Sequence, residues 1–441
     1  MRRLTFPLGG IHPVERKEST RRSASWNAII PSVSVVPLQQ HIGAPAEAVV
    51  GKGDTVGEGM LIGKAAGFVS ANIHSPVPGV VKEIRSIHLP NGVRTDAVVI
   101  ELQGEFDRLG KPQDLHDWSG ATPAELLELI KDAGVVGMGG ATFPTHVKFS
   151  VPKGRNCEFL IMNGTECEPY LSADHRLMVE RTAEVLQGVR IAAQILDPDQ
   201  VYIGIETNKP DAIVAMEREI KKTGLPYKVA PLRIKYPQGD EKQLIRAITG
   251  REVPSGGLPL DIGCVAANAG TLFAIYEAVA LRKPLIERLV TVGGGAIAKP
   301  ANLKVRIGTP MGELIEECGG FTQVPRKIVS GGPMMGQTVV DLDSPVTKGT
   351  SGILALTDRE VNSAPRTQCI QCGRCVEACP MGLQPTMLFK LIDHFEYKRA
   401  MDEGLMDCRE CGCCGYICPA RIPLVQGFRV GKRMARKAGK S

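Results

Sequence analysis

The stretches CIQCGRCVEACP (369–380) and CRECGCCGYICP (408–419) repeat one cysteine pattern near the end of the chain. Each reads C-x2-C-x2-C-x3-C-P, a spacing at which three thiolates close on one face of a [4Fe–4S] cluster. In two-cluster ferredoxins the fourth cysteine of each stretch ligates the other cluster. The pattern therefore predicts two crossed ligand sets, Cys369, Cys372, Cys375 and Cys418 for one cluster and Cys379, Cys408, Cys411 and Cys414 for the other.

Structural zinc is the alternative interpretation of these cysteines. Zinc sites normally use cysteine pairs, whereas each stretch here has a triplet and a fourth cysteine before proline. The extra thiol Cys413 is expected not to be a ligand. The chain has 13 cysteines and shows no secretory signal, which indicates a reducing compartment and metal ligands instead of disulfides. The four scattered cysteines are expected to be small buried hydrophobic residues: Cys157, Cys167, Cys264 and Cys318.

Length and charge set broad limits on the protein. A chain of 441 residues predicts two to four domains, and a net charge of +6 is too mild to indicate nucleic-acid binding. No uninterrupted apolar run reaches about 20 residues, so we expect no transmembrane segment. The nearest candidate, 262–281, is expected to be a buried loop and helix. Basic residues gather at both ends of the chain: Arg2, Arg3, Arg16, Lys17, Arg21 and Arg22, then Lys432, Arg433, Arg436, Lys437 and Lys440. They are expected to form solvated tails or, alternatively, to bind an anionic membrane face or an acidic partner.

Upstream of the cysteines, the pattern changes twice. Residues 35–102 alternate Val and Ile with glycine turns, which predicts a small β-sandwich. Residues 122–224 alternate helical and strand patterns, with strands at 158–163 and 201–206 and one helix at 175–196. This alternation predicts an α/β layer with parallel strand pairing.

Four short stretches carry the polar residues of a candidate ligand site. The loop VVGMGGATFPTHVK (135–148) can cradle a phosphate, because its glycines let the backbone approach and Lys148 supplies charge, although a plain glycine turn is an equal alternative. NGTECEP (163–169) follows an apolar strand, at the end where ligands bind in α/β sheets. The stretches YPQGDEKQL (236–244) and CVAANAGT (264–271) add further polar groups.

These four stretches, in this order, resemble the NADH-binding flavoprotein subunit of respiratory complex I. Together with the double-cluster end, GGATFPTHVK, NGTECEPYLSADHRLM and YPQGDEKQLIRAITGREVPSGGLPLDIGC resemble the RnfC family, which belongs to Rnf-type ion-translocating oxidoreductase complexes. The resemblance runs from PLQQHIGAPAEAVV to Pro419. Residues 35–102 also resemble lipoyl-type barrel-sandwich modules, but the hairpin GFVSANIHS (67–75) has no carrier lysine, and Lys64 lies earlier.

The resemblance implies a multidomain α/β plus β fold. Its parts are a barrel-sandwich domain (1–110), a Rossmann-like α/β domain for FMN and NADH (111–285), a β-grasp, SLBB-like domain (286–358), a helical two-[4Fe–4S] ferredoxin-type domain (359–425) and a basic tail (426–441).

The resemblance also implies roles for single residues. Gly137, Gly139, Gly140 and Lys148 would hold the FMN phosphate, with Asn163 and Asn268 near the flavin. The remaining cofactor-binding residues would be Phe143 beside the adenine or nicotinamide, Glu166, Glu168 and Glu241 at the nicotinamide and ribose, and Gly239, Asp240 and Thr271 around them. The sequence departs from complex I at Thr142, which stands in place of glycine, at Thr165, in place of an acidic residue, and at Asp240, in place of glutamate.

The implied activity is electron transfer between NAD(H) and ferredoxin through FMN and two [4Fe–4S] clusters, without catalytic acid–base residues. Partner subunits would move sodium or protons, and this chain would lie peripherally on the cytoplasmic side of the cell (inner) membrane. Two alternatives stay open. One is a cobalamin reductase of the propanediol-utilisation type, and the other is an electron-wire subunit without flavin.

Overall fold

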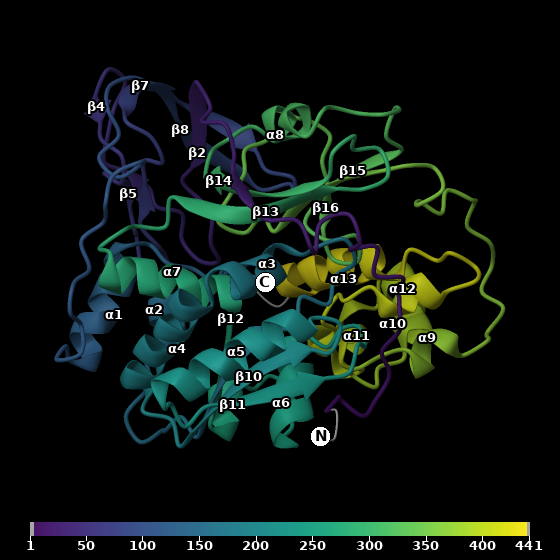
Figure 1. Cartoon of the computed structure of the whole chain (residues 1–441). Helices are drawn as coiled ribbons and strands as arrows, with labels where there is room; N and C mark the ends of the chain where they lie inside the picture. Colours follow the sequence, from purple (N-terminus) through teal and green to yellow (C-terminus); the bar gives the residue numbers. More distant parts are fainter. Residues whose placement is uncertain (1–3, 439–441) are drawn as a thin grey trace.

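The computed structural model describes residues 4–438. Figure 1 shows four parts: two β-rich parts above, an α/β part below them, and a helical part containing the cysteine stretches to one side. No helix in the described part of the chain is long and apolar enough to cross a membrane.

The first β-rich part contains two small antiparallel sheets around one core. One sheet has the order β2-β8-β7-β4, with strands Val33–Pro37, Arg94–Leu102, Gly79–His88 and Thr55–Val56. The other has the order β3-β5-β6, with strands Glu47–Ala48, Leu61–Lys64 and Ile73–His74. Val36, Ile62, Ile73 and Val98 come from both sheets and pack into one buried cluster. The predicted β-sandwich is therefore confirmed.

The α/β part is built on a parallel sheet of order β11-β10-β9-β12. Its strands are β9 Phe159–Gly164, β10 Gln200–Glu206, β11 Lys228–Leu232 and β12 Cys264–Asn268. Its helices are α1 Pro123–Asp132, α2 Thr145–Phe149, α3 Ala173–Glu180, α4 Thr182–Leu196, α5 Pro210–Thr223, α6 Glu241–Thr249 and α7 Ala269–Ala280, with a 3₁₀ turn at Pro259–Ile262. The chain steps outward from β9 to β11 and returns to the other side of β9 for β12. Ligands bind at such a switch point, beyond the carboxyl ends of the strands.

Two predictions about this part are wrong in detail. The helix expected over 175–196 is broken at Arg181, whose φ of −132° is not helical. The Thr182 hydroxyl donates to the carbonyl of Met178 (2.7 Å), a side-chain bond that competes with the helix ladder. Residues 262–281 were expected to be a buried loop and helix; the helix is present as α7, but Cys264–Asn268 form strand β12, because they pair with β9.

The second β-rich part is a mixed sheet of order β1-β14-β13-β17-β15-β16. Its strands are β1 Trp26–Asn27, β13 Glu287–Gly293, β14 Ala301–Arg306, β15 Lys327–Ser330, β16 Gln337–Thr338 and β17 Gly352–Leu356. Helix α8 (Met311–Glu317) covers it with Met311, Leu314 and Ile315. The edge strand β1 comes from the distant N-terminal region and pairs with β14 in parallel.

The cysteine stretches lie in a helical part with its own core. It contains α9 Arg374–Glu377, α10 Pro385–Asp393, α11 Tyr397–Asp402, a 3₁₀ turn at Leu405–Asp407, α12 Cys413–Ile417 and α13 Leu424–Ala438. The basic tail expected from residue 426 belongs to α13 as far as the structure describes it, because Leu424, Phe428 and Ala435 are buried on one helix face. Lys432 is also buried, and its Nζ donates to the carbonyl of Cys408 (2.6 Å). Lys440 lies outside the described residues.

Residues 4–27 form an N-terminal strap that crosses the molecule. Its backbone is joined to three distant segments, at Leu4–Leu232, Gly10–Ala378 (3.0 Å) and Glu15–Tyr170 (2.8 Å). Lys17 is buried and donates to the carbonyl of Glu166, so this residue is not part of a solvated tail. Arg2 and Arg3 lie outside the described residues.

Candidate cofactor sites

Two asparagines mark the switch point of the parallel sheet. Asn163 near the end of β9 and Asn268 at the end of β12 are register partners. The Asn268 side chain caps α7 by accepting from the N–H groups of Gly270 (2.9 Å) and Thr271 (3.3 Å). The Asn163 amide donates to the carbonyl of Gly239 (2.9 Å). Both asparagines therefore fix the backbone around the position where a ligand would bind.

The glycine loop lies beside this point. The Gly137 N–H donates to the carbonyl of Phe143 (2.8 Å), which closes the loop, and the Met138 N–H donates to the Thr271 hydroxyl (2.9 Å). A Cβ at Gly139 would lie only 3.4 Å from Cβ of Asn268, so the loop and the strand end are in close contact. Gly140 has φ of +104°, which favours glycine.

Two charged residues of the predicted site pair with each other. Lys148 on α2 and Glu241 at the start of α6 form an ion pair, with Nζ and Oε1 2.5 Å apart. The two side chains are 31% and 30% exposed, respectively. An anionic group that bound Lys148 would compete with Glu241 for the ammonium.

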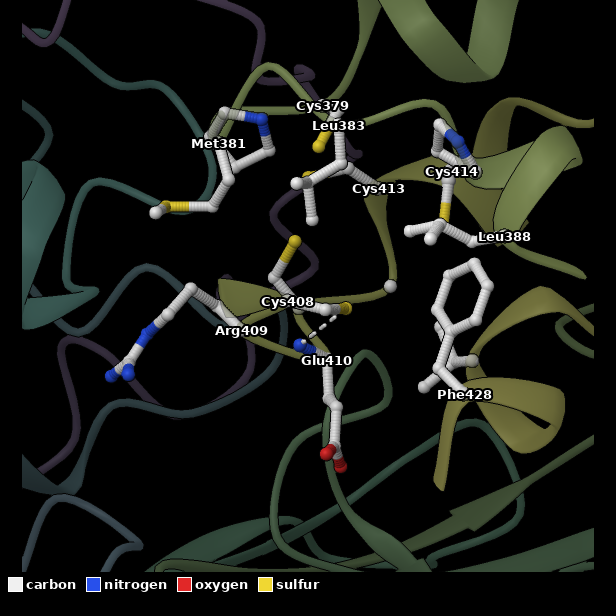
Figure 2. Close-up of a pocket in the computed structure, with 15 residues that line it drawn as sticks. Cys379, Met381, Leu383, Leu388, Cys408, Arg409, Glu410, Cys413, Cys414 and Phe428 are labelled. Atoms are coloured by element: carbon white, nitrogen blue, oxygen red, sulfur yellow. Dashed lines mark hydrogen bonds between the residues drawn. The ribbon is translucent and has the colours of Figure 1, made fainter. Parts of the chain in front are cut away.

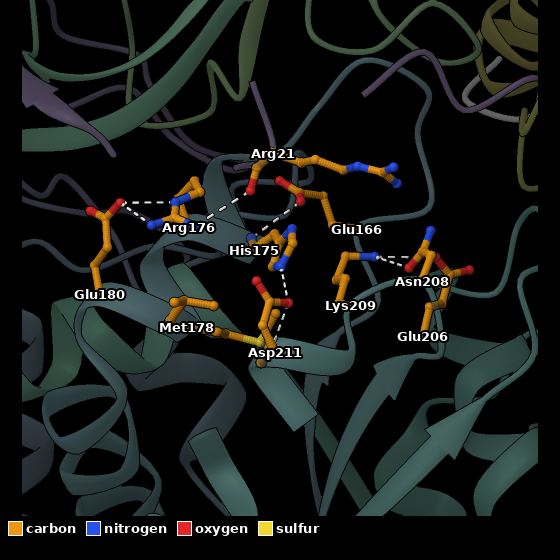
Figure 3. Close-up of polar contacts among 12 residues, drawn as sticks. Arg21, Glu166, His175, Arg176, Met178, Glu180, Glu206, Asn208, Lys209 and Asp211 are labelled. Atoms are coloured by element: carbon orange, nitrogen blue, oxygen red, sulfur yellow. Dashed lines mark hydrogen bonds and ion pairs between the residues drawn. The ribbon is translucent and has the colours of Figure 1, made fainter. Parts of the chain in front are cut away.

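The carboxylate of Glu166 is already used within the protein. It accepts from the N–H groups of Asp174 (2.8 Å) and His175 (3.2 Å) at the start of α3, where the helix dipole favours an anion. Figure 3 shows Glu166 close to His175, with Lys209 on a neighbouring segment. Lys209 is buried, and its Nζ donates to the carbonyl of Thr165 (2.5 Å). Lys17 and Lys209 thus both hold the 165–166 backbone.

Glu168 binds a loop of the second β-rich part. Its carboxylate accepts from the N–H groups of Met334 and Met335, each at 3.0 Å. Burial raises the pKa of Glu168 to about 7, against the two backbone N–H groups that lower it. The side chain therefore ties the end of the β9 segment to the loop between β15 and β16.

Asp240 joins the α/β part to the cysteine region. It caps α6 by accepting from the N–H groups of Lys242 (3.1 Å) and Gln243 (3.3 Å). Its other oxygen accepts from Nε of Arg409, at 2.7 Å. Glycine is required before it, because a Cβ at Gly239 would lie 2.5 Å from the Thr165 hydroxyl.

Five cysteines line the first cavity of the cysteine region. Four of them are the predicted ligand set, and we call them the inner quartet: Cys379, Cys408, Cys411 and Cys414. Leu383, Leu388 and Phe428 supply apolar walls, and Figure 2 shows Arg409 pointing away from the cavity. Burial raises the pKa of the Cys408 thiol to about 11. A metal cluster would offset this penalty, since a coordinating thiol is deprotonated.

A second cavity is lined by the other four cysteines of the repeat, the outer quartet: Cys369, Cys372, Cys375 and Cys418. Its walls include Gln371, Thr386 and Lys390, and Cys372 is exposed. Each quartet thus combines three cysteines of one stretch with the last cysteine of the other. Among residues 4–438, no three His, Cys, Asp or Glu side chains are arranged to hold a single metal ion.

Cys413 also borders the first cavity but has a different contact. It is fully buried, and its Sγ lies 3.9 Å from the carbonyl oxygen of Tyr236. The Tyr236 hydroxyl donates to the carbonyl of Cys411 (2.7 Å). The bridging roles of Tyr236 and Arg409 were not predicted from the sequence, although Arg409 stands between Cys408 and Cys411.

Four family models match the chain in order. They are the RnfC barrel sandwich hybrid domain (4–105), the Nuo51 FMN-binding domain (130–277), the SLBB domain (289–338) and the 4Fe-4S dicluster domain (368–422). Together with the two cavities, they define an iron–sulfur flavoprotein. They confirm the predicted fold class, and they support FMN and two [4Fe–4S] clusters as its cofactors.

Relatives narrow this class further. The chain is 47% identical to the C subunit of the proton-translocating ferredoxin:NAD(+) oxidoreductase complex of Clostridium ljungdahlii, over 98% of this chain and 94% of that protein. It is 44% identical to the C subunit of the Na(+)-translocating ferredoxin:NAD(+) oxidoreductase complex of Acetobacterium woodii, over 96% of each. The chain therefore belongs to the RnfC family of Rnf-type ion-translocating oxidoreductase complexes. A solved NAD+-reducing [NiFe]-hydrogenase is similar in fold, with a TM-score of 0.51 at 18% identity, over 72% of this chain and 62% of that one.

Proposed function

We propose that this chain is the NAD(H)-reactive subunit of a membrane-bound Rnf-type complex. In this complex, electrons pass between NAD(H) and ferredoxin while partner subunits move ions. One observation carries the proposal. The same chain contains two crossed cysteine quartets and, next to them, a parallel sheet whose switch point lies beside a glycine loop. The names of the relatives, which are ferredoxin:NAD(+) oxidoreductase subunits, support this activity. Neither the cobalamin reductase nor the flavin-free wire is favoured by these matches.

The inner and outer quartets would each hold one [4Fe–4S] cluster. Four thiols around one cavity match the donor set of such a cluster. The burial of Cys411 and Cys414 supports a cluster largely shielded from water in the inner cavity, whereas the exposure of Cys372 supports a more accessible one in the outer cavity.

The FMN phosphate would bind Gly137, Gly139, Gly140 and Lys148, with Asn163, Asn268 and Thr271 holding the surrounding backbone. The close contact of Gly139 with Asn268 supports this arrangement, because the loop lies at the strand ends where flavin would bind. When bound, FMN can take a hydride as two electrons and release them singly. Displacement of Glu241 from Lys148 would accompany phosphate binding.

The nicotinamide and ribose would bind on the side of the loop that faces Phe143 and Glu241. Glu166, Glu168, Gly239 and Asp240, which were also predicted to line this site, have internal contacts that support a second role. Their hydrogen bonds hold the backbone that forms the pocket wall.

We also propose the division of the chain at residues 110, 285, 358 and 425. Each sheet falls within one of these units apart from the added strand β1, and the helical core falls within 359–425 apart from Phe428 on α13. The chain would lie peripherally on the membrane complex, at its cytoplasmic side, where NAD(H) and ferredoxin are available.

The test is anaerobic purification of the full chain, followed by iron and sulfide analysis and an NADH titration with FMN present. About eight irons and eight sulfides per chain, with flavin and cluster absorbance bleaching on NADH, is the expected result. Eight irons with no response to NADH would overturn the NAD-reactive assignment and leave the cluster assignment intact. A chain that reduces a corrinoid but not ferredoxin would instead support the cobalamin reductase.

A further inference from the structure

The hairpin at residues 65–75 lies against the glycine loop. In a lipoyl-type module this hairpin would carry the modified lysine, but here it has none. Instead, Lys348 reaches it from the segment before β17. The Nζ of Lys348 donates to the carbonyl of Asn72 and to the carbonyl of Gly134, each at 2.7 Å. One ammonium therefore joins the hairpin to the start of the glycine loop.

The Lys348 side chain that connects the hairpin to the glycine loop is buried, and its polar groups are hydrogen-bonded. Its side chain is about 1% exposed, and burial lowers its pKa to about 7. Its backbone N–H donates to Oε1 of Gln40 (2.9 Å), and its carbonyl accepts from Arg288. Since both backbone groups and the ammonium are bonded, Lys348 has little freedom to leave the joint.

Other residues of the two β-rich parts contact the glycine loop at Thr142 and Met138. The Ile42 N–H donates to the carbonyl of Thr142 (3.2 Å). Thr142 has φ of +50°, an uncommon conformation for a β-branched residue, and its methyl group would lie 2.6 Å from a Cβ placed at Gly349. Arg288 also approaches the carbonyl of Met138, at 3.4 Å. Contacts from both β-rich parts thus fix the two sides of the loop.

We propose that the hairpin 65–75 and the turn 346–350 form a clamp that sets the FMN-binding conformation of the glycine loop. Lys348 is its positioning residue. The inference rests on the proposed flavin site and gives the barrel-sandwich domain a function that needs no attached lipoyl or biotinyl group. A loop held in its bound conformation loses less entropy when the phosphate binds, so the clamp raises the affinity for FMN.

The test is FMN binding to the full chain, measured by flavin fluorescence together with iron content and thermal unfolding. Lys348→Met leaves the carbonyls of Asn72 and Gly134 without their buried donor, and we expect FMN affinity to fall about tenfold or more. Iron content should stay unchanged, because Lys348 lies outside both cysteine cavities.

Gly134→Ala disrupts the same contact between the hairpin and the glycine loop, from the side of the loop. A Cβ there would lie 2.2 Å from the Asn72 carbonyl oxygen and 2.8 Å from Nζ of Lys348. Gly154→Ala is the matched control, since Gly154 has a similar positive φ (+83° against +63°) but no atom within 4 Å of the added Cβ. We expect weaker FMN binding for Gly134→Ala and no change for Gly154→Ala.

The inference is overturned if Lys348→Met and Gly134→Ala both bind FMN with the wild-type Kd. If neither variant folds, hydrogen exchange in the wild-type chain decides. FMN should then slow exchange in 134–148 and in 65–75 together, and protection of the loop alone would overturn the clamp. A wild-type chain that binds no FMN would overturn the flavin site itself, a result distinct from either of these.

Discussion

The two cysteine quartets have the same ligand spacing but different surroundings. The inner quartet is tied to the α/β part by three side chains, Tyr236, Asp240 and Gln243. The outer quartet lies nearer the surface, because its member Cys372 is exposed and the neighbouring Ile370 is 67% exposed. Cluster potentials depend on charge, hydrogen bonding and solvent exposure. Two clusters held by the same spacing would therefore differ in their electron-transfer properties, because the residues around the two quartets differ.

The largest effect is expected when one cysteine is removed from each quartet in turn. We expect Cys411→Ala and Cys372→Ala each to lower the iron content from about eight to about four per chain. Cys411→Ala should also lower the Tm far more, because the inner quartet packs against the α/β part. Anaerobic iron analysis and calorimetry measure both quantities. Equal loss of Tm would show that the two sites contribute alike to the fold.

A second test uses the pH dependence of the contact beside the inner quartet. The Glu168 carboxylate accepts from the N–H group of Met334. Met334 lies close to Gly412, because its carbonyl oxygen would be only 2.9 Å from a Cβ placed there, so Glu168 acts next to the inner quartet. The folded-state pKa of Glu168, about 7, lies above the ordinary 4.5, so the protonated form stabilises the fold. This stabilisation is complete below pH 4.5 and is lost as the pH rises through 7, to a total of about 3 kcal/mol.

Unfolding by denaturant between pH 5 and 8 measures this effect. Glu168→Gln should flatten the decline, because the amide stays neutral and its oxygen still accepts a hydrogen bond. Glu166→Gln is a useful comparison, since its carboxylate binds the start of α3 instead of the Met334 loop. An unchanged pH profile in Glu168→Gln would assign the decline to another group.

A smaller effect is expected from the charge beside the inner quartet. Arg409→Met removes a cation between Cys408 and Cys411 and should lower the reduction potential of the inner cluster by tens of millivolts, on the order of 50 mV. Asp240→Asn should raise it, because Arg409 loses its counter-ion. Redox titration followed by electron paramagnetic resonance measures both clusters at once, and the outer cluster serves as internal control. Equal shifts in both clusters would contradict the local effect.

The smallest effect is expected at the surface of the outer quartet. Ile370→Ala changes an exposed side chain, so the free energy of unfolding should change by less than about 0.5 kcal/mol. Iron content should remain that of the wild type. Leu388→Ala, at a buried residue of the inner cavity wall, is the contrasting variant, with an expected loss of about 3 kcal/mol.

The sequence was sufficient for features that depend on local spacing. Two cysteine stretches of fixed spacing predicted which cysteines line each cavity together, and short strand-like segments rich in apolar residues predicted β9 and β10. Contacts between distant segments could not be read in the same way. Glu168 meets Met334 and Asp240 meets Arg409 across separations of 166 and 169 residues. No local pattern in the sequence marks such pairs.

Burial of charged residues also could not be predicted from the sequence. The basic ends suggested solvated tails, yet Lys17 and Lys432 are buried with backbone carbonyls as partners. A lysine can be buried when its ammonium finds several acceptors, and these acceptors come from loops whose positions depend on the whole fold. The break between α3 and α4 had a weaker local signal, in the hydroxyl of Thr182.

The N-terminal strap has a consequence for synthesis of the protein on the ribosome. Leu4 and Gly10 are made first, but their partners Leu232 and Ala378 emerge much later. The part of the strap around Gly10 therefore stays unpaired until residue 378 has been translated, although Glu15 can pair with Tyr170 much earlier, and this part docks among the last to fold. A nascent chain that stops before residue 378 would leave the strap around Gly10 without its partner, so completion of the strap reports that the ferredoxin-type domain has arrived.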